Sequence, residues 1–198
     1  MTAGRKIDTS RDAAILDAAL DVLAESGYAG ITVSMVAARA KAGKATVYRR
    51  WTSKAQLVLD AVGRLNTELL DPEGLPDTGS LAGDLHALAG EEGPDEQRRL
   101  RVMVGLMSML DDEEGLADAA NAAVVEPWVA VNRVFLMRAV GRGEISAATD
   151  IETLAWVVPA MATYRVCVQR KPIPGRYVAS LIDTVLLPAV GLSATARG

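Results

Sequence analysis

Residues 32–54 read TVSMVAARAKAGKATVYRRWTSK, and this stretch decides the fold of the first quarter of the chain. Thr32 can cap a short helix of small residues, and the turn-forming sequence Lys41-Ala42-Gly43 follows that helix. A second short helix is then expected over about 44–51. Two short helices joined by a tight turn are typical of a helix-turn-helix motif, whose second helix lies in the major groove of DNA.

The side chains of this second helix separate into an apolar set and a polar set. Val47 and Trp51 lie one turn apart and should pack against the preceding helices. Lys44, at the helix start, can donate to guanine O6 and N7, and the small Ala45 can touch a thymine methyl. Ser34, in the preceding helix, can reach a base or a phosphate. Hydroxyls and cations that suit phosphate oxygens complete the predicted DNA surface: Thr46, Tyr48, Arg49, Arg50 and Lys54.

Charge is distributed unevenly along the chain. Residues 1–54 contain nine Lys or Arg and five Asp or Glu, whereas residues 55–198 contain twelve and twenty. A polyanion such as DNA is therefore attracted to the first quarter, although the net charge of the whole chain is −4. Chance clustering of charge explains the same counts, so a basic helix that merely faces water remains the alternative for 44–51.

The stretch ITVSMVAARAKAGKATVYRRWTSKAQLV, residues 31–58, resembles the N-terminal domain of TetR-type transcriptional regulators. The resemblance covers about residues 11–60. It implies an all-α homodimer, with an N-terminal three-helix DNA-binding domain at 1–54 and a larger helical effector-binding and dimerisation domain at 55–198. It also implies repression of target promoters, relieved by a small ligand.

The same resemblance implies that the eight side chains named above face DNA. The chain departs from the family pattern at the turn, which often reads Gly-Val-Ser, whereas this chain has Lys41-Ala42-Gly43. A helical small-molecule-binding protein whose DNA function has degenerated is therefore the alternative to a working repressor.

Capping residues and helical periodicity predict helices throughout the chain. Ser10 can cap a first helix over about 11–25, and Ser53 and Gln56 have capping-box spacing for a fourth helix that ends near Leu70. Thr149 has the same spacing for a later helix. Beyond residue 80, helices are predicted near 81–89, 95–110, 114–125, 127–141, 150–170 and 175–190.

The last two predicted helices are candidates for a dimer interface, because specific DNA sites usually require two recognition helices. Each carries an apolar stripe, and two such helices from each subunit would make a four-helix interface. The alternative is that both stripes face the subunit's own core. The stripe residues are Leu154, Val157, Val158, Met161 and Val168, and then Tyr177, Leu181, Thr184, Val185 and Pro188.

A ligand site is predicted among the later helices, where adaptable methionines and flat aromatic rings suit an apolar or amphipathic small molecule. Ordinary core packing is the alternative for each of these residues. The lone His86 is expected to be exposed or paired, without a function of its own. The predicted ligand-binding residues are Met103, Met107, Trp128, Asn132, Phe135 and Trp156.

Other functions have little support in the sequence. No nucleophile motif and no set of ligands at metal spacing occurs, so we expect neither an enzyme nor a cofactor-dependent protein. The lone Cys167 excludes an internal disulfide and suits a reducing cytoplasm. The uncharged stretch 153–164 is too short to span a bilayer, and residues 1–12 lack the apolar core of a signal peptide, so a cytoplasmic protein is expected.

Overall fold

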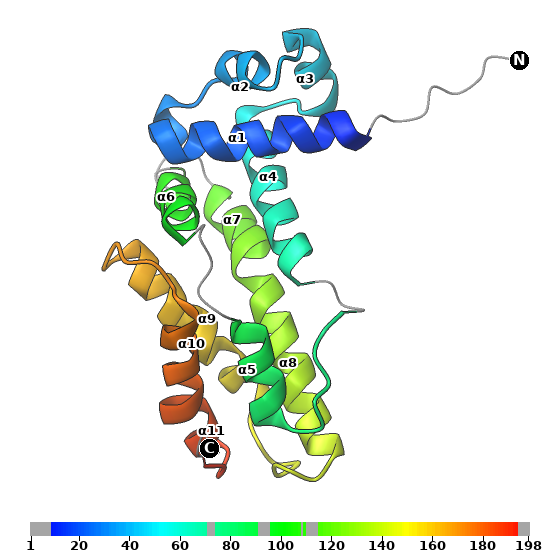
Figure 1. Cartoon of the computed structure of the whole chain (residues 1–198), viewed down its shortest axis with the longest axis vertical. Coiled ribbons are helices and arrows are strands. Elements are labelled where there is room, and N and C mark those ends of the chain that lie inside the picture. The colour runs from blue at the N-terminus through cyan, green and yellow to red at the C-terminus, as the bar shows by residue number, and fades with distance from the viewer. Residues whose placement is uncertain (1–8, 71–73, 91–95, 108, 110–114, 194–198) are drawn as a thin grey trace, which may run out of the picture.

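The structure is a computed structural model that describes residues 9–70, 74–90, 96–107, 109 and 115–193. Every regular element in these ranges is helical, which confirms the predicted all-α fold (Figure 1). The N-terminal elements are α1 (Thr9–Gly30), α2 (Val33–Arg39), α3 (Lys44–Arg50) and α4 (Lys54–Leu69). The later elements are α5 (Leu81–Ala89), α6 (Glu96–Met107), α7 (Leu116–Val124), α8 (Glu126–Gly141), α9 (Ile151–Cys167), α10 (Gly175–Leu181), a π-helical turn (Ile182–Leu186) and α11 (Leu187–Ala189).

Two of the predicted helix caps are present. The Met35 N–H donates to Thr32 Oγ1 at 3.2 Å at the start of α2. The Gln56 N–H donates to Ser53 Oγ at 3.0 Å at the start of α4. Each cap satisfies an N–H that the first helical turn leaves unpaired, so these local signals fixed the helix starts correctly.

Two other predicted caps are wrong. Helix α1 begins at Thr9, so Ser10 lies inside it. Helix α9 is capped by Asp150 rather than Thr149, because the Asp150 carboxylate accepts both the N–H and the hydroxyl of Thr153, at 3.1 and 2.7 Å. These two hydrogen bonds lower the pKa of Asp150, since they favour the charged carboxylate.

The predicted last helix, 175–190, is one continuous helical stretch that changes its winding. It runs from α10 through the π-helical turn into α11. The predictions near 95–110 and 114–125 extend onto residues outside the described ranges. Within those ranges they correspond to α6 and α7.

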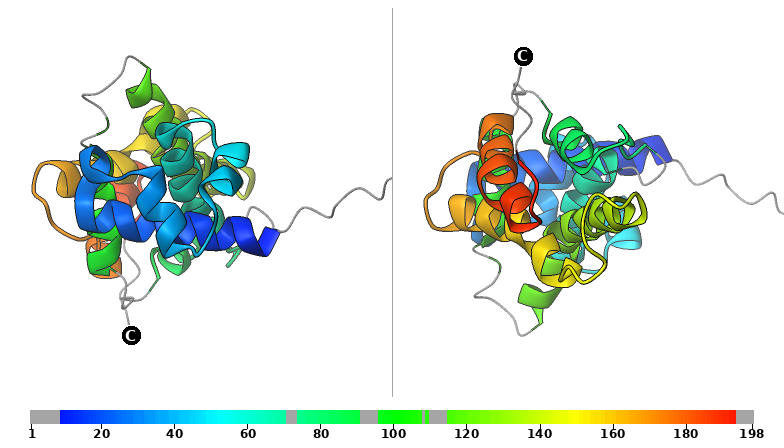
Figure 2. Two further views of the ribbon diagram at one scale, coloured as in Figure 1. Left: turned by 90° about the horizontal axis from the view of Figure 1, so that it is seen from above. Right: turned by 90° about the horizontal axis from the view of Figure 1, so that it is seen from below.

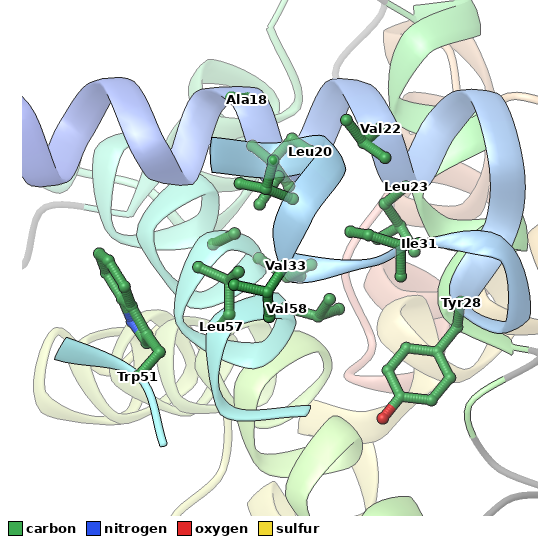
Figure 3. Close-up of a cluster of buried hydrophobic side chains, with 14 of the residues drawn as sticks. Ala18, Leu20, Val22, Leu23, Tyr28, Ile31, Val33, Trp51, Leu57 and Val58 are labelled. Atoms are coloured by element: carbon green, nitrogen blue, oxygen red, sulfur yellow. The ribbon is translucent and has the colours of Figure 1, made fainter. Parts of the chain in front are cut away.

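Two buried apolar clusters divide the packing between them. The first joins α1, α2 and α3 to the first half of α4, and it also receives side chains from α6 and α7. Figure 3 shows its centre, where Leu57 and Val58 of α4 meet side chains of α1 and α2. The second cluster is built mainly from α5, α8, α9 and the C-terminal helical stretch. The predicted division between domains at residue 54 stays a prediction, and the first cluster extends past it to Val62 of α4 and to side chains of α6 and α7.

Helix α1 lies across one end of the molecule, and α2 and α3 cover its outer side (Figure 1). Helix α4 runs from α3 toward the remaining helices and packs on both α1 and α7. The views along the long axis show α2 and α3 as the outermost elements at that end (Figure 2). No helix in the described part of the chain is long and apolar enough to cross a membrane.

Candidate nucleic-acid interface

The turn between α2 and α3 has the geometry of a helix-turn-helix despite its unusual residues. Lys41 adopts a left-handed backbone conformation with φ of 50°. The Lys41 N–H donates to the Ala38 carbonyl at 3.2 Å and the Ala42 N–H donates to the Ala37 carbonyl at 2.9 Å. This pattern closes a helix and reverses the chain, although glycine is the residue that most often occupies the left-handed position.

Helix α3 is anchored by its apolar side. Val47 is fully buried, and the buried Trp51 donates its indole N–H to Asp60 Oδ2 at 2.8 Å. These contacts fix the rotation of α3 about its own axis, so its opposite side faces away from the molecule.

Four of the predicted DNA-binding side chains lie exposed on that outer side. Tyr48 is 54% exposed. The other three are Lys44, Ala45 and Arg49. The structure describes no ion pair for Lys44 or Arg49, so both cations face solvent. Ser34 and Thr46 are half-buried at the edge of the same surface.

The two remaining predicted contacts are held by the chain itself. Arg50 forms an ion pair with Asp12 of α1, with Nη1 and Oδ2 at 2.9 Å. Lys54 donates to the Tyr28 carbonyl at 2.9 Å and lies 4.0 Å from the centre of the Tyr28 ring. Both cations therefore also tie α3 and α4 to α1, a role that the local sequence did not indicate.

Helix α2 is tied to α1 by a bidentate ion pair. Arg39 donates from both terminal nitrogens to the Glu25 carboxylate, each at 2.6 Å. These hydrogen bonds lower the pKa of Glu25 and raise the pKa of Arg39, because they favour the charged form of each partner. The pair holds the end of α2 that leads into the turn.

The six predicted ligand-binding residues have different surroundings, and their role in binding a ligand stays a prediction. Phe135 has no exposed surface and belongs to the second cluster. The buried Asn132 donates to the Ala155 carbonyl at 3.2 Å. Met103 packs against the first cluster, and Trp156 is exposed on α9. Trp128 is half-buried, and its indole N–H lies 3.4 Å from Asn66 Oδ1.

One open hollow is described, and it lies elsewhere. It has a volume of about 770 Å³ and lies between α1, α6 and the loop after α9. Met107 is the predicted ligand residue that lines it. Two cations that line the hollow, Arg101 and Arg170, were not singled out from the sequence, because only the tertiary structure brings them together.

Apolar side chains are exposed along α9 and the C-terminal helical stretch. Two residues of the predicted stripes, Val158 and Leu181, are buried within the subunit. For these two residues, the alternative that the stripe faces the subunit's own core holds. Met161, Val168 and Val185 are exposed. The structure adds exposed residues that the stripes omitted: Trp156, Tyr164 and Ile173.

His86, which was expected to be either exposed or paired, is paired. Its Nε2 lies 2.8 Å from Asp183 Oδ1, which joins α5 to the π-helical turn. Cys167 is half-buried, and burial raises the pKa of its thiol. Among the described residues, no group of three or more His, Cys, Asp or Glu could hold a metal ion.

Comparison with known proteins identifies both parts of the chain. Residues 15–61 match the family described as bacterial regulatory proteins, tetR family. Residues 75–185 match the family described as tetracyclin repressor-like, C-terminal domain.

Two relatives match over nearly their whole length. The DNA-binding transcriptional repressor TetR of Mycobacteroides abscessus is 34% identical over 179 residues, which cover 90% of this chain and 93% of the relative. The HTH-type transcriptional regulator YdeS of Bacillus subtilis is 30% identical over 196 residues, covering 97% of this chain and 96% of the relative.

Solved structures share the fold at lower identity. A TetR-family transcriptional regulator from Rhodococcus sp. superposes with a TM-score of 0.71 at 22% identity, covering 90% of this chain and 99% of that protein. The transcriptional regulator FadR from Bacillus subtilis, solved in complex with stearoyl-CoA, gives a TM-score of 0.66 at 19% identity, with coverage of 92% and 98%.

Proposed function

Because the chain belongs to the TetR family of bacterial transcriptional regulators, we propose that it represses transcription as a dimer on a palindromic operator. A small apolar or amphipathic effector releases it from that operator. Its work on the chromosome would place it in the bacterial cytoplasm. This role requires a surface that reads DNA, a second subunit and a connection between effector and DNA.

The outer side of α3 is the observation that carries the proposal. Lys44 and Arg49 present cations, and Tyr48 presents a hydroxyl, on the outermost element of one end of the molecule. In this proposal Lys44 and Ala45 contact base edges, and Tyr48 and Arg49 bind phosphates, with Ser34 and Thr46 at the margin. Arg50 and Lys54 already bind Asp12 and the Tyr28 carbonyl, so they contact phosphates only through their remaining N–H groups.

A dimer would place two copies of α3 on one face of a duplex. Successive major grooves on that face are about 34–36 Å apart, which sets the spacing of the two half-sites. The exposed apolar side chains of α9 and the C-terminal stretch support a pairing through these elements. Met161 and Tyr164 of α9 and Val168, the residue that caps its end, follow one another at spacings of three and four residues and so lie on one side.

Helix α4 is the proposed connection between the two functions. The Asn66 amide, buried near the end of α4, donates to the Ala123 carbonyl at 2.7 Å and to the Val124 carbonyl at 3.2 Å. These bonds join α4 to the last turn of α7. A shift of α7 or α8 on effector binding would move α4 and change the separation of the recognition helices. By linkage, effector and operator then weaken each other's binding by the same factor, typically about 5–150-fold.

Electrophoretic mobility shift with DNA from upstream of the chain's own gene tests the proposal. We expect binding that survives competition by unrelated duplex and that falls about 10³-fold or more between 50 and 200 mM salt. A Lys44→Ala/Arg49→Ala double variant, checked for its helix content, should lose this binding. Weak binding that is equal for both proteins and for unrelated DNA would instead favour the small-molecule-binding protein without DNA function.

A further inference from the structure

The hollow between α1 and α6 combines an apolar surface with two cations. Leu100, Val104 and Met107 of α6 supply apolar surface, and the buried Leu23 of α1 also lines the hollow. Arg101 of α6 and Arg170, from the loop after α9, are its charged lining residues. Its volume of about 770 Å³ lies within the range of small-molecule sites, which is roughly 300–1,000 Å³.

Neither of these two arginines forms an ion pair within the described ranges, and both belong to exposed residues. The nearby Glu25 accepts two hydrogen bonds of 2.6 Å from Arg39. These bonds and a weaker attraction to Arg101 lower the pKa of Glu25, so Arg101 interacts with this carboxylate without pairing with it. The neighbouring Arg98, by contrast, is held by Asp21 at 2.7 Å. Arg101 and Arg170 can therefore both donate to an anion that enters the hollow.

The backbone of Arg170 provides a second, independent observation. Arg170 adopts the left-handed conformation with φ of 55°, and the following Lys171 N–H donates to the Arg165 carbonyl at 3.2 Å. Glycine occupies the left-handed position after α8 and α11, at Gly143 and Gly191, and Lys41 is the other described non-glycine residue that shares this conformation with Arg170. A side chain that occupies this conformation despite its cost is a reason to look for a function of that side chain.

We propose that this hollow binds a small amphipathic anion, with an apolar chain against α1 and α6 and a carboxylate or phosphate head on Arg101 and Arg170. The two head groups share the same chemistry, because guanidinium groups bind both in a bidentate manner. Figure 1 shows the loop after α9 beside α6, below α1, so one ligand can contact all three elements.

A ligand in this hollow would contact α1, the helix against which α2 and α3 pack. Helix α6 approaches α1 closely at Gly105, since a Cβ there would lie 2.7 Å from the Leu23 carbonyl oxygen. An acyl chain that enters beside this contact changes the packing of α1 on α6. This regulatory consequence rests on the proposed repressor function, whereas the binding site itself does not.

Isothermal titration of the full chain with dodecanoate and dodecyl phosphate, each below its micelle concentration, tests the site. Methyl dodecanoate is the uncharged probe of matched chain length. We expect one anion to bind per chain and the ester to bind at least about tenfold more weakly, because it cannot form charge-assisted hydrogen bonds. The tighter of the two anions identifies the head group. Equal binding of the ester, or no binding of either anion, would overturn the proposal.

Three variants separate the site from general charge effects. Arg101→Gln and Arg170→Gly should each weaken anion binding at least about fivefold, since each removes one charged donor. Arg170→Gly also relieves the left-handed backbone, so it should be no less stable than the parent, and lost binding cannot be attributed to unfolding. Arg99→Gln removes an exposed cation of α6 outside the hollow and should change nothing. An equal loss in Arg99→Gln would contradict the assignment.

The two proposals fail in different experiments. A chain that binds dodecanoate but no operator retains the site and refutes the repressor. A chain that binds its operator with equal affinity with and without saturating dodecanoate, bound at this hollow, refutes the effect of the ligand on α1. If the probe lowers operator affinity in the parent but not in Arg170→Gly, both the site and its consequence are supported.

Discussion

Arg49 and Arg50 are adjacent in the sequence but differ in their surroundings. Arg49 is exposed with no described ion pair, whereas Arg50 is paired with Asp12 at 2.9 Å. In the proposed complex, a phosphate would compete with Asp12 for Arg50 but would meet no such partner at Arg49. Identical side chains in one helix therefore differ in their surroundings, which a helical wheel alone does not reveal.

Replacing Arg49 with Ala should lower the slope of log affinity against log salt by about one unit, because one phosphate contact is lost. Replacing Arg50 with Ala should change this slope by less. It should also lower the free energy of unfolding by about 0.2–1 kcal/mol, since the partly buried ion pair with Asp12 is lost. Fluorescence anisotropy at several salt concentrations and urea unfolding measure the two effects. Equal changes of slope would show that Asp12 does not hold Arg50 in the complex.

At the scale of elements, helix caps and apolar spacing in the sequence predicted the helices well but did not predict the tertiary contacts. Thr32, Ser53 and helical periodicity located α2, α3 and α4, because caps and apolar spacing act within a few residues. The ion pair between Arg50 and Asp12 and the contact of Lys54 with Tyr28 join residues far apart in the sequence. No local pattern encodes such pairs, so the sequence assigned both cations to DNA alone.

The hollow between α1 and α6 could not be predicted either, because no local pattern encodes contacts between distant parts of the sequence. Its lining comes from α1, α6 and the loop after α9, and only folding brings these together. The predicted ligand set, chosen for residue type, lies in two cores and at the surface, as Phe135 and Trp156 illustrate, and it stays a prediction. Residue type alone does not indicate which side chains the fold brings together.

The turn of the helix-turn-helix should be stabilised by Lys41→Gly. The left-handed conformation costs a side-chain-bearing residue about 1–2 kcal/mol, and the greater freedom of unfolded glycine offsets part of the gain. We expect the free energy of unfolding to rise by about 0.5–1 kcal/mol. Lys41→Ala is the matched control, because it removes the same charge but keeps the strained conformation. Stabilisation of equal size in both variants would point to charge rather than backbone.

The ion pair between Glu25 and Arg39 should make the N-terminal helices sensitive to acid. Because the folded state lowers the pKa of Glu25, its stabilisation is fully present above the unfolded pKa, near 4.5, and is lost as the pH falls through the folded pKa. Glu25→Gln should melt at a lower temperature than the parent at pH 7, and this difference should vanish on acidification. Both partners are exposed, so added salt should shrink it as well. A difference that persists at low pH would rule out the pair as its cause.

At the scale of the whole molecule, the arrangement separates the proposed DNA-binding end from an apolar flank. Helices α2 and α3 form one end, and α9, which carries exposed apolar side chains, lies away from it (Figure 1). Helix α4 packs on α1 and on α7, and its buried Asn66 bonds to α7. In the proposed mechanism, this contact lets a change in α7 alter the position of α4 and α1.

The apolar flank should be required for DNA binding because it pairs two subunits. Tyr164→Glu/Val168→Glu should convert a dimer into a monomer in sedimentation equilibrium, since it places charges in the proposed apolar interface. Operator affinity should fall at least about 100-fold, because one recognition helix reads too few base pairs. Met137→Glu, at a comparably exposed methionine of α8, should preserve both properties. A dimeric Tyr164→Glu/Val168→Glu protein would place the interface elsewhere.

Selection of bound duplexes from a random DNA library tests most directly whether the outer side of α3 reads DNA. The parent protein should enrich a two-fold symmetric sequence, with half-sites centred about 34–36 Å apart on one face of the duplex. Lys44→Ala should relax the preference at one base pair in each half-site, by about 1–3 kcal/mol. No enriched sequence from the parent, or an identical preference from Lys44→Ala, would contradict the reading of bases by α3.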